Sequence, residues 1–291
     1  MSTPPHLSLP PCARARTLDT DRGPFAVHEA QPAGTATASV VLVPGFTGSK
    51  EDFITVLEPL AAAGYHVLAY DQRGQFETPG PDDEAAYSLD ALGADLLAVA
   101  ATTGAPAHLV GHSFGGLVVR TATIAAPAAV RSATLLCSGP GPIRVAREAD
   151  RIQTLLSALG MFSVADIWTF AHAAAATNGE YDGVAPDVLD FLARRFLSTA
   201  KAGMTAMATA LTGTPDRTAE LAATQVPVLV AHGAKDYIWL PAEQAEMATR
   251  LGAAHAVIPG AAHSPAVEQP AETVALLARF WADPTSIVYT E

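Results

Sequence analysis

The hydrophobic residues of the chain alternate between short continuous runs and stripes at helical spacing. The continuous runs are rich in Val, Leu and Ala and end near Gly, Pro, Asp or Ser, as buried strands do. They occupy residues 39–46, 66–74, 107–113, 132–139, 226–236 and 254–263. Helical stripes separate most of them, and strands joined by single helices pair in parallel because parallel neighbours need a crossover. The pattern predicts an α/β fold with a mostly parallel central sheet flanked by helices.

The alternation stops between residues 144 and 221, where only helical stripes occur. We expect this segment to be an all-helical insertion, a cap over a core formed by residues 1–143 and 222–291. Large apolar residues of a cap can line a pocket, because ligand pockets are mostly apolar. The predicted pocket residues are Trp168, Met204 and Met207 from the insertion and Ile238 from the core.

Composition narrows the possible partners and locations. The formal net charge of −12 disfavours nucleic acid and anionic membranes as partners. No apolar run reaches the length of about 18 residues that a membrane helix needs. The Pro-rich N-terminus lacks the continuous apolar core of a secretory signal and predicts a loose arm. Cys12 and Cys137 suggest no disulfide framework. We therefore expect a cytoplasmic protein with a small-molecule partner, and the oligomeric state stays open.

The stretch "LVGHSFGG" places Ser113 between two glycines, after a predicted strand and before a predicted helix. A sharp turn of this kind raises a serine hydroxyl above the sheet and needs small neighbours, which Gly111 and Gly115 supply. The helix that follows favours negative charge near its N-terminus. The alternative is a glycine-rich turn with a helix-capping serine. The flanking pattern favours a nucleophile.

A serine nucleophile needs a base, and the base needs an acid to orient it. Among the nine histidines, His263 follows the last predicted strand and can reach the sheet edge where Ser113 lies. His66 and His108 begin strands, His112 should point away from Ser113, and His172 lies in the insertion. We therefore predict His263 as the base.

Asp236 ends the strand that follows the insertion, and is the predicted acid. The chain order Ser113, Asp236, His263 matches one known arrangement of the serine triad. Asp71 precedes the serine and should fix its own loop with Arg73, whereas Glu268 should start the last helix. The backbone N–H groups of Phe46, after "PG", and of Phe114 are the predicted oxyanion donors.

Together, "PGF", "DQRG", "GHSFGG", "HGAKD" and "GAAHSPAVEQP" resemble the α/β-hydrolase superfamily, in its serine-esterase-like branch with a helical cap. The resemblance covers the chain from about Arg16 onward and implies the same five site residues. A serine at residue 113 departs from the epoxide-hydrolase and dehalogenase branches, which the resemblance associates with aspartate. Residues 75–78 depart from the usual Arg-Gly loop, so whether Gln75, Phe76 and Glu77 contact substrate stays open.

No dinucleotide fingerprint and no metal-ligand spacing is found, so no cofactor and no metal are expected. The sequence predicts a serine hydrolase of carboxylic esters with small, largely apolar substrates. The alternatives are the same triad acting on a thioester or a C–C bond, a cofactor-free lyase, and a ligand receptor that retains binding without turnover.

Overall fold

A computed structural model describes residues 2–285 and is built around one eight-stranded sheet with the strand order β1-β2-β4-β3-β5-β6-β7-β8. The strands from β4 to β8 in this order pair in parallel, whereas β1 pairs with β2 and β2 with β4 in antiparallel fashion. The predicted mostly parallel sheet is therefore confirmed. The strands are β1 (Ala13–Thr20), β2 (Gly23–Ala30), β3 (Ala38–Val43), β4 (Tyr65–Tyr70), β5 (Ala107–His112), β6 (Val130–Leu136), β7 (Val228–Gly233) and β8 (Ala254–Ile258).

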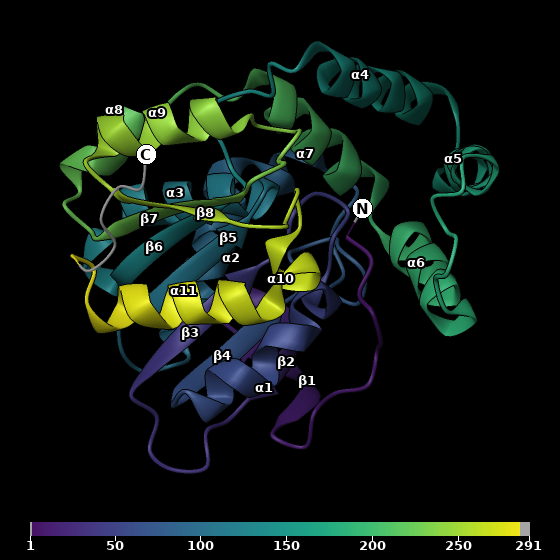
Figure 1. The fold of residues 1–291 in the computed structure, drawn as a ribbon. Coiled ribbons are helices and arrows are strands. Elements are labelled where there is room, and N and C mark those ends of the chain that lie inside the picture. The colour runs from purple at the N-terminus through teal and green to yellow at the C-terminus, as the bar shows by residue number, and fades with distance from the viewer. Residues whose placement is uncertain (1, 286–291) are drawn as a thin grey trace.

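Helices cover both faces of the sheet (Figure 1). On one face lie α1 (Ile54–Ala62) and α11 (Pro270–Ala282), which pack on Val40 and Leu42 of β3. On the other lie α2 (Leu89–Ala101), α3 (Phe114–Ala125), α8 (Thr218–Ala223) and α9 (Pro241–Leu251), which pack on Val41 and Val43. Alternate residues of a strand point to opposite faces, so a run buried on both sides is continuously apolar. Short elements complete the core: η1 (Lys50–Phe53), η2 (Glu84–Tyr87), η3 (Pro127–Ala129) and α10 (Pro265–Glu268).

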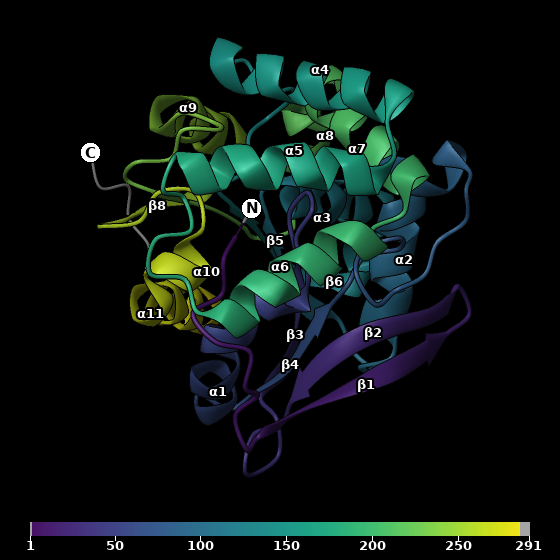
Figure 2. The same ribbon diagram turned by 90° about the vertical axis from the view of Figure 1, so that its right-hand side faces the viewer.

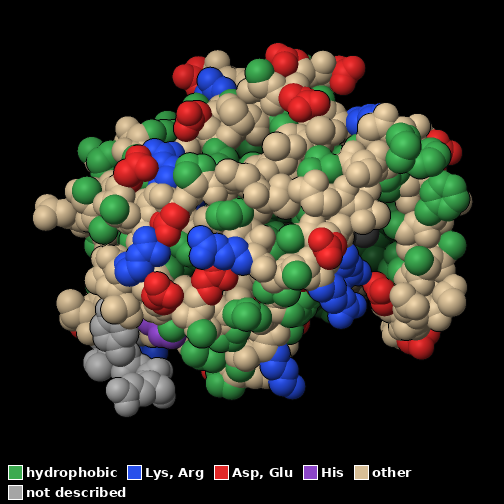
Figure 3. Space-filling view, turned by 90° about the horizontal axis from the view of Figure 1, so that it is seen from above, with side chains coloured by type: hydrophobic (Ala, Val, Ile, Leu, Met, Phe, Trp, Pro, Cys, Tyr) green, Lys and Arg blue, Asp and Glu red, His purple; other side chains and the backbone are tan. Residues whose placement is uncertain are grey.

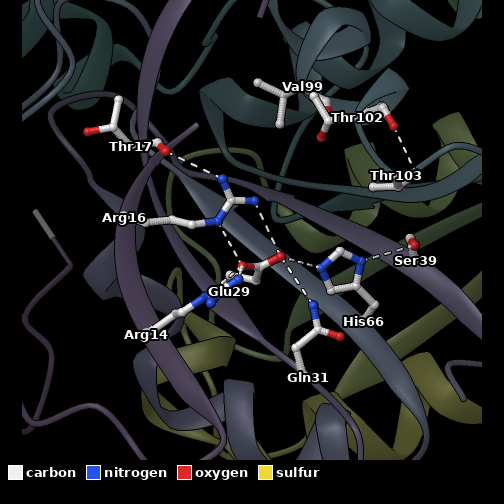
Figure 4. Close-up of polar contacts among 11 residues, drawn as sticks. Arg14, Arg16, Thr17, Glu29, Gln31, Ser39, His66, Val99, Thr102 and Thr103 are labelled. Carbon is white, nitrogen blue, oxygen red and sulfur yellow. Dashed lines mark hydrogen bonds and ion pairs between the residues drawn. The ribbon is translucent and has the colours of Figure 1, made fainter. Parts of the chain in front are cut away.

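The N-terminal region is more ordered than the predicted loose arm. Residues 13–30 form the β1–β2 hairpin, and Leu9 and Cys12 before it pack against the core. Glu29 of β2 lies at the centre of a polar cluster in which it accepts hydrogen bonds from Arg14, Arg16 and Gln31 (Figure 4). His66 of β4 contacts the same carboxylate at 2.9 Å. This buried acidic group, with the pairing of β2 and β4, holds the hairpin to the sheet. The partners of Glu29 are polar or charged side chains, which explains why the hydrophobic pattern does not reveal the hairpin.

The insertion between β6 and β7 is helical, as its stripes predict. Its helices are α4 (Ala146–Met161), α5 (Val164–Thr177), α6 (Pro186–Ser198) and α7 (Lys201–Gly213). Figure 2 shows these four helices lying together across one side of the sheet. The predicted boundary at residue 221 falls inside α8, which packs on α3 and α9 of the core. The division into core and cap stays a prediction.

Among residues 2–285, no helix combines the length and the apolar character that crossing a membrane requires.

Candidate active site

Ser113 occupies a strained turn between β5 and α3. Its backbone has φ 54° and ψ −120°, a conformation that non-glycine residues adopt rarely and that requires support from the surrounding structure. The support comes from close backbone packing: a Cβ on Gly115 would lie 2.3 Å from the carbonyl oxygen of Val43. One on Gly111 would lie 2.2 Å from the carbonyl oxygen of Gly115. The two glycines flanking Ser113 are therefore required by the turn.

The structure brings Ser113, His263 and Asp236 together from three separate strand ends. His263 Nε2 lies 3.0 Å from Ser113 Oγ, and His263 Nδ1 lies 2.9 Å from Asp236 Oδ1. Both contacts are within hydrogen-bonding distance. The three residues follow β5, β8 and β7, whose carboxyl ends meet at one edge of the sheet. In space, the imidazole of His263 thus lies between the hydroxyl of Ser113 and the carboxylate of Asp236.

Asp236 is buried and keeps its charge. Burial alone would raise its pKa, but the hydrogen bond and charge of His263, with hydrogen bonds from the Ile238 N–H and the Gln244 amide, lower the pKa below its usual value. The two donors lie 3.1 Å from Oδ1 and 2.8 Å from Oδ2. Asp236 is therefore an ionised acceptor with both oxygens engaged, as a group that orients an imidazole must be.

The alternative acid, Asp71, belongs to a different cluster. Its carboxylate accepts hydrogen bonds from the backbone N–H and the Nζ of Lys50 at 2.7 and 2.9 Å. Arg73, the partner expected from the sequence, pairs instead with Asp95. Asp71 thus fixes its loop as predicted, but through Lys50, because Arg73 points to the neighbouring helix α2.

The loop after β3 approaches Ser113 closely. A Cβ on Gly45 would lie 3.1 Å from the Cβ of Ser113, so only a small residue fits without displacing a neighbour. Within residues 2–285, neither the N–H of Phe46 nor that of Phe114 donates to another protein group. Two uncommitted N–H groups beside a nucleophile are what an oxyanion hole requires. The geometry is consistent with the predicted roles of Phe46 and Phe114.

A cavity of about 480 Å³ opens in front of Ser113 and His263. Its apolar wall comes from the insertion and the neighbouring core loops, and includes the predicted residues Trp168 and Ile238. Other apolar lining residues include Phe46, Ile143, Ile152, Leu155, Ile167, Phe196 and Leu211. Polar groups are also present, among them Asp52, Glu148 and Arg151.

Met204 and Met207 do not line this cavity, so this part of the pocket prediction is wrong. Met204 packs with Leu159 and Phe196 inside the insertion, and Met207 packs against the core. Both side chains are buried, at 0% and 1% exposure. Helical spacing identified them as apolar but could not show which side of α7 faces the cavity.

The four histidines that the sequence analysis set aside as bases all make structural contacts. His112 is buried, and this burial, with the neighbouring His263, lowers its pKa to about 3. Its Nε2 lies 2.6 Å from the backbone carbonyl of His263, a contact that holds the loop of the predicted base. His66 contacts Glu29, His108 contacts Ser132, and His172 stacks on Trp168.

The sequence did not reveal three further neighbours of the site. Ser2 lines the cavity and its Oγ lies 2.9 Å from that of Ser264, and Gln244 binds Asp236. Cys137, Asp236 and His263 form a group whose potential metal-ligand atoms lie within 4.8 Å of one another. An ion there would have to replace the His263–Asp236 hydrogen bond, so the arrangement fits an acid–base pair better than a metal site. Ser2 and Cys137 lie far from their partners in the chain and Gln244 lies eight residues from Asp236, and no local motif signals any of these contacts.

Comparisons with known proteins agree with this architecture. The sequence model of the alpha/beta hydrolase family matches residues 40–276. The chain is 32% identical over 200 residues to "Putative carbamate hydrolase RutD" from Variovorax paradoxus, a match that covers 68% of this chain and 74% of that protein. It is 37% identical over 110 residues to epoxide hydrolase A from Mycobacterium tuberculosis, covering 38% of this chain and 34% of the relative.

Solved structures show the same fold. Epoxide hydrolase A from Mycobacterium thermoresistibile superimposes with a TM-score of 0.70 at 22% identity, covering 93% of this chain and 98% of that chain. Bromoperoxidase from Bacillus anthracis superimposes with a TM-score of 0.74 at 20% identity, covering 93% and 100%. The chain is therefore a member of the alpha/beta hydrolase family of enzymes.

Proposed function

We propose that the protein is a serine hydrolase that cleaves carboxylic esters through an acyl-enzyme formed on Ser113. The observation that carries the proposal is the pair of contacts that His263 makes, 3.0 Å to Ser113 Oγ and 2.9 Å to Asp236 Oδ1. A serine hydroxyl is a weak nucleophile alone, and a base within hydrogen-bonding reach makes it reactive. The Asp236 contact orients the base by fixing the proton on Nδ1, which leaves Nε2 free to accept.

In the first half of the reaction, Ser113 Oγ attacks the acyl carbon while His263 Nε2 takes the hydroxyl proton. The carbonyl oxygen of the substrate becomes negatively charged and accepts hydrogen bonds from the N–H groups of Phe46 and Phe114. His263 then donates the same proton to the departing alcohol oxygen, and the acyl group remains on Ser113.

In the second half, water takes the place of the alcohol. His263 accepts a proton from the water as it attacks the acyl carbon, and returns it to Ser113 Oγ when the acid is released. Charged Asp236 stabilises the imidazolium in both halves, and its lowered pKa keeps it ionised over the working range of a histidine base.

The cavity supports a small, largely apolar substrate. A space of about 480 Å³ suits a small molecule, and Trp168, Leu155 and Ile167 offer apolar contact to it. We propose that the helices of residues 144–221 act as the lid that carries this wall, and that the physiological partner is a small molecule in the cytoplasm.

A second candidate substrate class is the carbamates. The relative from Variovorax paradoxus carries the name of a carbamate hydrolase and aligns over 68% of this chain. Attack on a carbamate uses the same nucleophile and oxyanion donors, and the difference lies in the leaving group. The geometry of residues 113, 236 and 263 does not distinguish the two.

A substrate panel with the purified chain tests the proposal. We expect turnover of p-nitrophenyl esters, and faster turnover of esters than of matched carbamates, thioesters and diketones. Preferred turnover of carbamates would replace the ester with the second candidate. Tight binding of the panel compounds without turnover would identify a receptor and contradict the proposal.

A further inference from the structure

Two buried glutamines, in the segment 72–75 after β4, contact the loop of residues 44–46, which carries the proposed oxyanion donor Phe46 and is called the oxyanion loop below. The amide nitrogen of Gln72 donates to the carbonyl oxygen of Pro44 at 2.9 Å. The amide nitrogen of Gln75 donates to the carbonyl oxygen of Gly45, also at 2.9 Å. Both side chains are almost fully buried, at 1% and 0% exposure. We propose that Gln72 and Gln75 are positioning residues that fix the direction of the Phe46 N–H, an inference that rests on the proposed ester hydrolysis.

The geometry of the peptide bond links Gln75 to the proposed oxyanion donor. The carbonyl of Gly45 and the N–H of Phe46 belong to one planar peptide unit, and the chain has no cis peptide bond among the described residues. In a trans peptide the two groups point in opposite directions. Gln75 holds the oxygen of this unit together with the N–H of Gly48, which donates to it at 3.1 Å. The N–H of Phe46 is therefore directed to the other side, where Ser113 approaches Gly45. Gln72 does the same for the preceding unit, Pro44–Gly45.

The chemistry of the partners fixes which end of each amide faces the loop. Carbonyl oxygens only accept hydrogen bonds, so the amide nitrogens must face them. The amide oxygens of Gln72 and Gln75 then have no hydrogen-bond partner within residues 2–285. A buried acceptor without a partner destabilises a fold, and an apolar side chain of the same length would avoid that cost. The two glutamines therefore supply hydrogen-bond donors to the loop at the expense of fold stability. Such a loss of stability is expected where function requires a particular side chain.

Gln75 also connects the oxyanion loop to the insertion. Its amide nitrogen lies 3.9 Å from the Sδ of Met207 on α7. The N–H of Ala200, just before α7, donates to the carbonyl of Gly74 at 2.8 Å. The segment 72–75 thus lies between α7 and the oxyanion loop. It does not line the described cavity, which answers the question left open by the sequence: Gln75 acts from behind the site and not on the substrate.

The experiment replaces Gln75 with Met, which keeps the length of the side chain but removes both the donor and the unpaired oxygen. Gln72→Met is measured in parallel, and Gln31→Met, at an exposed glutamine directly after β2 and far from Ser113 in the chain, is the matched control. For each purified variant, kcat and KM on p-nitrophenyl butyrate, the thermal midpoint, and the Ki of a trifluoromethyl ketone are measured. The ketone forms a tetrahedral oxyanion on the serine and reports the oxyanion hole directly.

We expect Gln75→Met to lower kcat about tenfold to a hundredfold, less than the loss of a whole donor, with KM within about threefold. The Ki of the ketone should rise by the same factor as kcat/KM falls, while the thermal midpoint stays close to that of the wild type. Gln72→Met should show the same pattern more weakly, and Gln31→Met should match the wild type.

A pH series on Gln75→Glu provides an independent readout. The glutamate has the same shape, and only its protonated form can donate to Gly45. Its kcat relative to the wild type should therefore recover as the pH falls, which a purely structural defect would not show.

Unchanged kcat and Ki in folded Gln75→Met and Gln72→Met would overturn the proposal. So would a fall in kcat without a matching rise in Ki. If either Gln75→Met or Gln72→Met fails to fold, the other variant and the pH series on Gln75→Glu still test the proposal. Ester turnover by the wild type and by Gln31→Met tests the proposed function separately, whatever the other variants do.

Discussion

At the scale of single residues, the strained backbone of Ser113 marks the centre of the candidate site. Its positive φ is maintained by glycine packing on both sides, so the side chain itself contributes little to the turn. We expect Ser113→Ala to abolish ester turnover while the thermal midpoint changes by only a few degrees, because the hydroxyl lost carries the chemistry and not the fold. Steady-state assays and thermal melts check this. Turnover within tenfold of the wild type would remove Ser113 from its role.

Asp236 gives a second prediction at this scale. In Asp236→Asn the amide nitrogen or oxygen faces His263, so the imidazole tautomer needed for proton acceptance is no longer enforced. We expect kcat to fall by about three to four orders of magnitude with the fold intact. Asp19→Asn on the exposed hairpin is the control. A mild effect at Asp236 together with a severe one at Asp71 would assign the acid to the other cluster.

The sequence could predict which three residues the structure brings together, because each lies at the end of a strand with a recognisable pattern. Ser113 has its glycines, and the order Ser113, Asp236, His263 restricts the partners. The supporting contacts of Gln75, Gln244 and Ser2 could not be predicted, because they depend on which groups the folded chain brings near these side chains. A buried glutamine has no periodic signature.

At the scale of elements, the structure corrects the predicted position of the α7 methionines relative to the cavity, and this has a testable consequence. Trp168 of α5 lines the cavity, whereas Met207 of α7 contacts Gln75 behind it. Each substrate methylene buried in the cavity adds roughly 0.8 kcal/mol, or about fourfold in kcat/KM. In the wild type, kcat/KM on p-nitrophenyl esters should rise from acetate to butyrate or hexanoate and then fall.

The two variants should respond differently to this chain-length series. Trp168→Ala enlarges the cavity, so its optimum should move to longer chains. Met207→Ala should lower kcat at all lengths without moving the optimum. A flat series unaffected by Trp168→Ala would mean that the insertion does not select the acyl group.

The elements themselves were predictable to different degrees. Strands β3 to β7 are almost entirely buried and leave a nearly continuous apolar signal, and the edge strand β8 is short and apolar apart from His255. The hairpin strand β1 is mostly exposed or half-buried, and its pairing with β2 relies on Arg14, Arg16 and Glu29. Its hydrophobic pattern is therefore too weak to distinguish a strand from an arm.

At the scale of the whole molecule, acidic side chains outnumber basic ones, 29 to 17, yet both kinds are interspersed over the face above α4, α8 and α9 (Figure 3). Buried titratable groups are expected to contribute to the acid sensitivity of the fold. Burial, with a smaller contribution from Arg131, lowers the pKa of His108 to about 4. His108 stacks on Trp281 with ring centroids 4.9 Å apart.

A histidine with a lowered pKa binds fewer protons in the folded state than in the unfolded state, whose pKa is about 6.5. Its contribution to stability is therefore complete above that value and is lost as the pH falls toward 4. Between these values it should add a slope of about 1 kcal/mol per pH unit. His108→Phe keeps the ring but cannot titrate, so its unfolding free energy should fall less steeply between pH 6.5 and about 4.5. Denaturant titrations of both chains measure the slopes, and identical slopes would contradict the assignment.

The central claim is that Ser113 is the nucleophile, activated by His263. The most direct measurement is mass spectrometry of the chain after reaction with a fluorophosphonate, with peptide mapping and parallel activity assays. The account predicts one adduct per chain, located on Ser113, formed in step with the loss of ester turnover and absent from Ser113→Ala. Equal labelling of Ser113→Ala, or full activity in a chain labelled at Ser113, would contradict it.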